Sequence, residues 1–231
     1  MNPLPYLDIH AHRKGQLENS VTVQSLSMDD IQLERISSDY VTAGIHPWWI
    51  DEFTHAELEN VKTHILTMID ENKLWAIGET GIDRVYPETL DRQKELFKWH
   101  FDLSEQHELP LVIHNVRSGS DFLEFIKANK PTRPWIFHDF RGNEELLRKI
   151  LQLHSESYFS FGLSIDNSQA IRELLPFVPL SNLFLETDDQ KHLDIHDIHL
   201  RASDKIGVDA EFLKAQLWLN FRKITPQHLF T

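Results

Sequence analysis

The sequence of 231 residues contains no cysteine, no stretch rich in proline, glycine or serine, and no long apolar run. The lack of cysteine excludes disulfides and thiolate metal sites, so imidazole and carboxylate groups must hold any bound metal ion. No run approaches the roughly 18 apolar residues of a membrane span, and no basic segment followed by a long apolar one begins the chain. We therefore expect a cytoplasmic protein that does not enter a membrane.

Positive charge is also scarce, with 23 lysines and arginines against 36 acidic residues and a net charge of −13. This balance argues against broad electrostatic attraction to nucleic acid or to an anionic membrane. It leaves room for a local cationic site, because divalent ions alter local charge sharply while barely changing the total. No segment of the sequence indicates an obligate protein partner.

The chain has no linker-like segment and no internal repeat, which predicts one domain over residues 1–231. Eight short apolar runs alternate with segments of helical period, and this alternation predicts a single α/β domain, a (β/α)8 TIM barrel. Helices are expected near residues 55–72, 88–108, 118–129, 143–154, 168–175 and 209–223. The first two connections are too short for full crossover helices. We therefore expect irregularity around the first and second βα units, between residues 13 and 40.

Polar residues that can bind metal follow the predicted strands. His10 and His12 end the first run two residues apart, which places both side chains on one face of a strand. The carboxyl ends of barrel strands converge on one face, so the shared placement indicates a site, although each residue alone is usually structural. Imidazole and carboxylate suit zinc, manganese, cobalt or magnesium, and a carboxylate such as Glu79 can bridge two ions. The candidate metal-binding residues at the ends of predicted strands are His10, His12, His46, Glu79, His114, His138 and Asp188.

Six ordered motifs carry a family resemblance: DIHAH (8–12), GIHP (44–47), GETGID (78–83), VIHNVR (112–117), HDFRG (138–142) and ETD (186–188). In order and spacing, the chain resembles the TatD-like metal-dependent hydrolases, a deoxyribonuclease family within the amidohydrolase superfamily. The resemblance spans nearly the whole chain. It implies a TIM barrel with two divalent metal ions (zinc, magnesium, manganese or cobalt) that hydrolyses phosphodiester bonds, commonly those of DNA, and acts on DNA ends.

The resemblance also implies individual roles. His10, His12 and Asp188 would hold one ion, His114 and His138 the other, and Glu79 would link them. Glu79 and Asp188 are thus the expected catalytic residues, and Asp188 would orient or deprotonate the attacking water. His46, Arg117 and Arg141 are assigned to the substrate, which is DNA or a small phosphodiester. Arg117 can equally form a salt bridge at the barrel rim, and His46 can equally orient its loop.

Three residues depart from the family pattern, namely Asp139, Arg141 and Asp189. They leave the expected ligands intact and fall in loops that shape specificity, so they bear on the substrate. Two other functions stay open: an amidohydrolase-type enzyme acting on a small phosphoester, amide or lactone, and a catalytically silent barrel with a binding role. Glu79 in place of a lysine favours the phosphodiesterase branch, and the intact ligand set argues against a silent barrel.

Three further motifs have simpler interpretations. Residues 192–199, with three histidines, are expected to form a solvated rim segment rather than a second metal site. Trp48 and Trp49 can stack on bases or pack as a loop lid, and the sequence does not separate these alternatives. Gly78 and Gly81 are expected to be backbone turn positions around Glu79.

Overall fold

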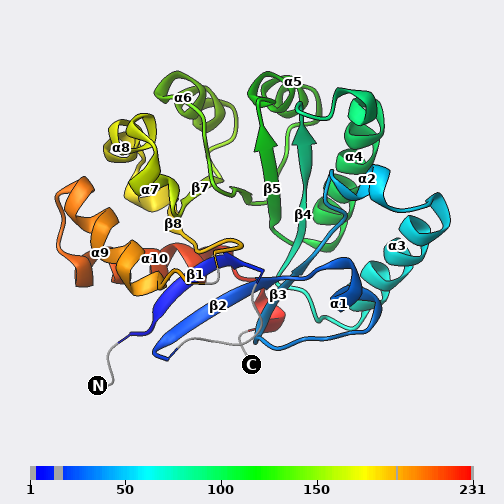
Figure 1. The fold of residues 1–231 in the computed structure, drawn as a ribbon, viewed down its shortest axis with the longest axis horizontal. Coiled ribbons are helices and arrows are strands. Elements are labelled where there is room, and N and C mark those ends of the chain that lie inside the picture. Colours follow the sequence, from blue (N-terminus) through cyan, green and yellow to red (C-terminus); the bar gives the residue numbers. More distant parts are fainter. Residues whose placement is uncertain (1–3, 13–17, 191, 230–231) are drawn as a thin grey trace.

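The computed structural model describes residues 4–12, 18–190 and 192–229. Its centre is an eight-stranded parallel sheet whose strands follow chain order (Figure 1). The sheet closes where Ala11 bridges Asp188, with hydrogen bonds from His12 N to Asp188 O (3.1 Å) and from Asp188 N to His10 O (3.0 Å). The predicted TIM barrel is therefore confirmed. The strands are β1 (Tyr6–Ala11), β2 (Ser20–Ser25), β3 (Tyr40–Ala43), β4 (Ala76–Asp83), β5 (Leu111–Val116), β6 (Trp135–Phe137), β7 (Ser157–Phe161) and β8 (Leu183–Leu185).

Helices surround the sheet, and the six that the sequence predicts are present. Side-chain caps fix several of their starts: Thr54 and Glu57 form a capping box, and Asn143 and Asp209 each accept a backbone N–H. The predicted helices are α3 (His55–Asp70), α4 (Leu90–His107), α5 (Gly119–Asn129), α6 (Glu144–Leu153), α8 (Gln169–Leu174) and α10 (Ala210–Ile224). The others are α1 (Met28–Gln32), α2 (Trp49–Glu52), α7 (Ser164–Asn167) and α9 (Ile195–Ile206).

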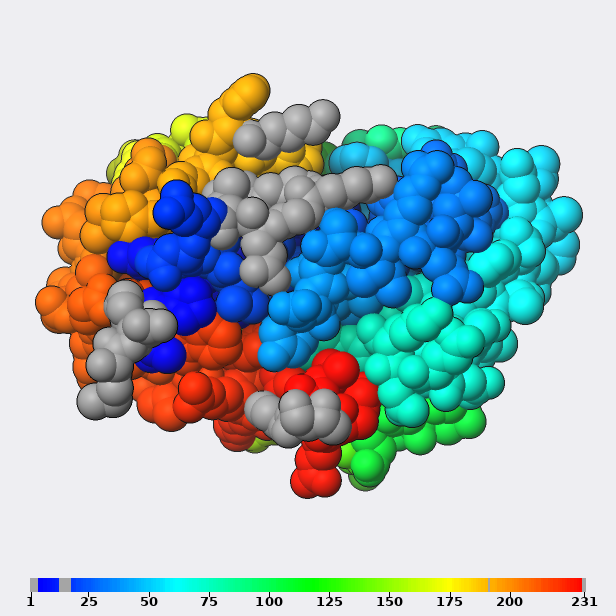
Figure 2. Space-filling model, turned by 90° about the horizontal axis from the view of Figure 1, so that it is seen from below, coloured from blue at the N-terminus to red at the C-terminus, as the bar shows by residue number. Residues whose placement is uncertain are grey.

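The strands β1 to β3 have little helical cover, as the short connections between them predict. The second connection contains α1, a helix of only 5 residues, whereas α4, which connects β4 to β5, has 18 residues. Part of the first connection, residues 13–17, lies outside the described residues. The C-terminal helix α10 packs beside β1, and Figure 2 shows the blue N-terminal and the orange-red C-terminal segments side by side. Trp218 Nε1 of α10 donates to Pro5 O at 2.7 Å. The two ends of the described chain thus pack against each other beside β1, where helical cover is sparse.

The core consists of the barrel interior and the layer between sheet and helices. Aromatic rings fill much of the layer under α4 and α5, where Phe97 meets Phe122 edge to face at 5.1 Å and Trp135 packs beside both. These three rings are fully buried. No helix in the described ranges is long and apolar enough to cross a membrane.

Two expectations need correction. Residues 192–199 are not wholly solvated, because α9 begins at Ile195 and buries Ile195, Ile198 and His199 on one face, with His199 Nε2 3.0 Å from Leu7 O. Gly78 and Gly81 lie inside β4 rather than in turns. A Cβ on Gly78, whose φ is 124°, would come within 2.4 Å of Val112 O, so close packing against β5 requires the glycine.

Candidate metal centre

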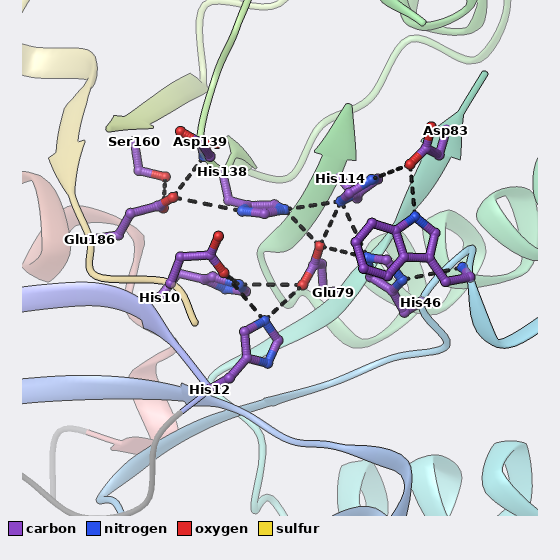
Figure 3. Close-up of polar contacts among 12 residues, drawn as sticks. His10, His12, His46, Glu79, Asp83, His114, His138, Asp139, Ser160 and Glu186 are labelled. Atoms are coloured by element: carbon purple, nitrogen blue, oxygen red, sulfur yellow. Dashed lines mark hydrogen bonds and ion pairs between the residues drawn. The ribbon is translucent and has the colours of Figure 1, made fainter. Parts of the chain in front are cut away.

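The metal-binding residues expected from the sequence meet around Glu79, at the carboxyl end of the barrel (Figure 3). Glu79 Oε1 lies 3.0 Å from His46 Nε2, 2.9 Å from His114 Nδ1 and 2.6 Å from His138 Nε2. This carboxylate is buried, with 5% of the residue exposed. One of its oxygens therefore faces three imidazoles that come from β5 and from the ends of β3 and β6.

The other Glu79 oxygen faces the N-terminal histidines. Glu79 Oε2 lies 3.3 Å from both His10 Nε2 and His12 Nε2. Asp188 completes this side, with Oδ1 3.5 Å from His12 Nε2 and 3.8 Å from His10 Nε2. The pairing of β1 with the segment after β8 brings Asp188 here, and its side chain stays 31% exposed. Glu79 thus lies between two groups of nitrogen ligands.

Hydrogen bonds define which ring nitrogens carry lone pairs toward the centre. Trp48 N donates to His46 Nδ1 at 3.2 Å, so His46 Nε2 carries the proton and donates toward Glu79. His114 has the opposite arrangement, because its Nε2 lies 3.2 Å from Asp83 Oδ2 and donates to that carboxylate. When His114 is neutral, with its proton on Nε2, the Nδ1 lone pair is free for a metal ion. Burial opposes charge on this ring, but in the absence of a metal its hydrogen bonds to Asp83 and Glu79 raise the pKa of His114.

Two acids that the sequence analysis did not assign support these imidazoles. Asp83 holds His114, and Glu186 Oε1 lies 3.7 Å from His138 Nδ1 while accepting a 2.8 Å hydrogen bond from Asp139 N. Glu186 also accepts a hydrogen bond from Ser160 Oγ. Both acids belong to quoted motifs: Asp83 lies on the same strand as Glu79, four residues on, and Glu186 lies two residues before Asp188. Period-two placement was the signal that could have found them.

The donor set fits divalent metal ions. His10 is fully buried; its Nδ1 has no hydrogen bond to a described residue, and its Nε2 faces the carboxylates of Glu79 (3.3 Å) and Asp188 (3.8 Å). His138 Nδ1 lies 3.7 Å from Glu186 Oε1 and also lacks a hydrogen bond to a described residue. An unpaired buried nitrogen is unfavourable unless another partner binds it. Three overlapping groups have ligand atoms within 4.8 Å of one another: His10, His138 and Asp188; His10, His12 and Glu79; His46, Glu79 and His114.

The electrostatics also favour positive charge around Glu79. Burial opposes ionisation of Glu79, yet the surrounding histidines hold its pKa well below the usual value. Burial likewise opposes charge on His138, but Glu79 and Glu186 raise the pKa of His138 well above its usual value. Burial lowers the pKa of His46, which agrees with a neutral donor ring. The buried Glu79 carboxylate is therefore ionised, and the groups around it compensate its negative charge.

The residues assigned to substrate do not all lie in the cluster. Arg117 and Arg141 are exposed and line a hollow beside it that also includes His114, His138 and Asp188. Arg141 pairs with Asp139 at 2.6 Å, whereas Arg117 forms no ion pair with any residue that the structure describes. The salt-bridge alternative for Arg117 thus finds no partner in that part of the chain. Trp48 is exposed beside the cluster, and Trp49 is half-buried against Phe53.

Comparisons with known proteins agree with this geometry. The model of the family described as TatD related DNase matches residues 8–223. The uncharacterized metal-dependent hydrolase TatD of Mycobacterium tuberculosis is 31% identical over 158 residues, covering 64% of this chain and 57% of the relative. The uncharacterized metal-dependent hydrolase YcfH of Escherichia coli is 29% identical over 165 residues, covering 71% and 60%. The aligned parts thus span less than two thirds of either relative.

Two crystal structures share the fold. YjjV, a TatD homologue from Escherichia coli, superposes with a TM-score of 0.79 at 18% identity, covering 95% of this chain and 97% of YjjV. An uncharacterized amidohydrolase from Saccharomyces cerevisiae gives 0.73 at 15% identity, covering 96% and 100%. These two likenesses concern the fold, while the match of the family model to residues 8–223 shows that the chain belongs to the TatD-related DNase family.

Proposed function

We propose that this protein is a two-metal phosphodiesterase that acts on the ends of DNA. The observation that carries the proposal is the position of Glu79, whose two oxygens face different sets of imidazoles. A carboxylate placed in this way can bridge two cations. The description of the matching family as DNases supports the choice of DNA.

The residues divide between two ion positions. His10, His12 and Asp188 would hold one ion, His114 and His138 the other, and Glu79 would contact both. His46 is left out because its Nε2 carries a proton, which suits a hydrogen-bond donor to Glu79 or to substrate rather than a ligand. When bound, such ions lower the pKa of water and neutralise the charge on phosphoryl oxygens.

The chain's own groups would complete the reaction. Asp188 is the partly exposed carboxylate of the cluster, so it can accept the proton of the attacking water and release it to solvent. Arg117 and Arg141 can donate to phosphate oxygens through charge-assisted hydrogen bonds. With a net charge of −13, the protein would engage DNA through this local site rather than through a broad basic surface.

Access to the cluster favours chain ends. The hollow that contains the two arginines measures about 540 Å³, and a second hollow on the other side of the cluster measures about 310 Å³. Both volumes are typical of small-molecule sites. A single-stranded or frayed end would enter such hollows more easily than an intact duplex.

The test uses chelator-treated protein that is reloaded with zinc, magnesium, manganese or cobalt. Each form is assayed on bis(p-nitrophenyl) phosphate, on single-stranded, frayed and blunt oligonucleotides, and on amide and lactone substrates. We expect metal-dependent cleavage of the phosphodiesters, with frayed ends cleaved faster than blunt ends. Cleavage of the small ester alone would refute DNA as the substrate and support the small-phosphodiester alternative. Turnover of amides or lactones alone would refute phosphodiester chemistry, and inactivity on every substrate would favour a silent barrel.

A further inference from the structure

Two hollows of different character meet at the metal centre. The smaller one lies toward β2 and β3 and is walled by Leu26, Gly44, His46 and Trp49. The larger one lies toward α5 and α6 and contains Arg117 and Arg141. Four residues line both hollows, namely Trp48, His114, His138 and Asp188. The cluster thus has an aromatic wall on one side and arginines on the other.

Trp48 stands at the junction and is fixed along one edge of its ring. Its Nε1 donates to Asp83 Oδ2 at 2.8 Å, the same oxygen that His114 contacts. The indole meets His46 and His114 edge to face, with centroid distances of 4.8 and 5.8 Å. It is nevertheless 46% exposed. An indole that is held at its polar edge while its surface stays open is a stacking platform rather than a core residue.

Arg141 is also held in place. Asp139 Oδ2 accepts hydrogen bonds from Arg141 Nε (2.8 Å) and Nη2 (2.6 Å), and Asp139 N is bound in turn by the buried Glu186. Arg141 Nη1 makes no hydrogen bond to a described residue, so it can donate to a ligand. Arg117 faces the same hollow. Two guanidinium groups that line one hollow, one of them held by Asp139, can bind a phosphate together.

We propose that the substrate spans both hollows. A nucleobase stacks on Trp48 in the smaller hollow, the scissile phosphate lies at the cluster, and the next phosphate along the chain binds Arg117 and Arg141. This inference rests on the proposed phosphodiesterase function and defines its substrate: a nucleotide chain with a phosphate adjacent to the one that is cleaved. Asp139 and Arg141, two departures from the family pattern, thereby acquire a role in specificity.

The test compares three substrates: dithymidine monophosphate, and the same dinucleotide with an added phosphate at its 5′ or at its 3′ end. We expect Arg117→Ala and Arg141→Ala each to raise KM about tenfold for one phosphorylated form, because a charge-assisted hydrogen bond is lost. KM for the unmodified dinucleotide, which lacks the adjacent phosphate, should rise far less. Arg148→Ala is the matched control, since Arg148 on α6 also pairs with a neighbouring acid, Glu144, at 2.7 Å. It should match the wild type on all three substrates.

Trp48 is tested with two substitutions. Trp48→Leu removes the ring and should raise KM roughly tenfold for all three substrates, since stacking no longer contributes. Trp48→Phe keeps a ring but loses the hydrogen bond to Asp83, and should retain most of the affinity. Bound metal and melting temperature are measured for each variant. An unchanged KM in Trp48→Leu would overturn the stacking role, and so would an equal loss in Trp48→Phe.

The outcomes separate the two proposals. If the arginine variants affect the unmodified dinucleotide as much as the phosphorylated forms, the second phosphate site is wrong while the phosphodiesterase proposal stands. If the metal-loaded wild type cleaves none of the substrates, their equilibrium binding is measured instead. The same variant pattern in Kd would then preserve the two-hollow site and refute the hydrolytic function, whereas no binding would refute both.

Discussion

Buried histidines serve opposite purposes at the metal centre and in the barrel wall. His100 on α4 is fully buried, and backbone groups satisfy both of its nitrogens: Nε2 accepts from Ile45 N (2.9 Å) and Nδ1 donates to Leu96 O (2.7 Å). His10 is equally buried, yet its Nδ1 has no hydrogen bond within the described chain and its Nε2 faces the Glu79 carboxylate at 3.3 Å. The same side chain at the same burial is thus a structural brace in one region and, on our proposal, a metal ligand in the other.

The backbone is strained at three positions of the rim. Arg117, Asp139 and Asp188 follow β5, β6 and β8, and their φ angles of 55°, 36° and 52° lie in the left-handed region that disfavours side chains. Residues in this conformation carry strain that the surrounding structure must offset, and such residues gather at functional sites. Five described residues away from the cluster, among them Glu108 and Lys130 at helix C-termini, share this conformation, so the strain is present at the rim without being confined to it.

Asp188→Asn should give the largest effect on the rim. The amide cannot accept the proton of the attacking water, so we expect kcat to fall by roughly a thousandfold or more, with a smaller change in KM. Steady-state kinetics on a phosphodiester at saturating metal measure this. Asp189→Asn, at the neighbouring position outside the expected ligand set, is the control. A kcat within threefold of wild type for Asp188→Asn would remove the residue from the mechanism.

A fall in pH should lower the free energy of unfolding through His199, which lies in the barrel wall. Burial lowers the pKa of His199 to about 4, below its ordinary value of 6.5. The unfolded chain therefore binds a proton that the folded chain refuses, so this contribution is intact above pH 6.5 and is lost as pH falls toward 4, at about 1.4 kcal/mol per pH unit. Urea unfolding across this range should show a shallower acid slope in His199→Gln than in His192→Gln, whose side chain is exposed. Identical slopes would contradict the assignment.

A smaller effect on stability should distinguish the two buried histidines, His100 and His10. In chelator-treated protein, His100→Leu should lower the free energy of unfolding by about 2 kcal/mol, because Ile45 N and Leu96 O lose their partner. His10→Leu should cause a smaller loss, since Nδ1 has no hydrogen bond and only the contact of Nε2 with Glu79 is removed. Urea denaturation of both variants measures the difference. Equal destabilisation would mean that His10 is a brace as well.

The sequence predicts the barrel and the composition of the ligand set, because both depend on short-range periodicity and on the shared end of parallel strands. Asp83 escapes prediction because β4 continues four residues beyond Glu79, with an irregular register against β5, and only that register brings Asp83 to His114. The protonation of His46 escapes it too, since it depends on one backbone N–H from Trp48. His199 was misassigned because alternating acids hide the apolar spacing of α9.

If Glu79 joins two ion positions, the number of bound metal ions must depend on its carboxylate. Purified wild type, Glu79→Gln and His46→Ala proteins are saturated with zinc or manganese, freed of excess metal and analysed by elemental mass spectrometry. We predict two ions per chain for the wild type and for His46→Ala. Glu79→Gln should hold at most one, because a neutral amide leaves two close cations without compensating charge. Two tightly bound ions in Glu79→Gln would show that Glu79 does not join the two ion positions.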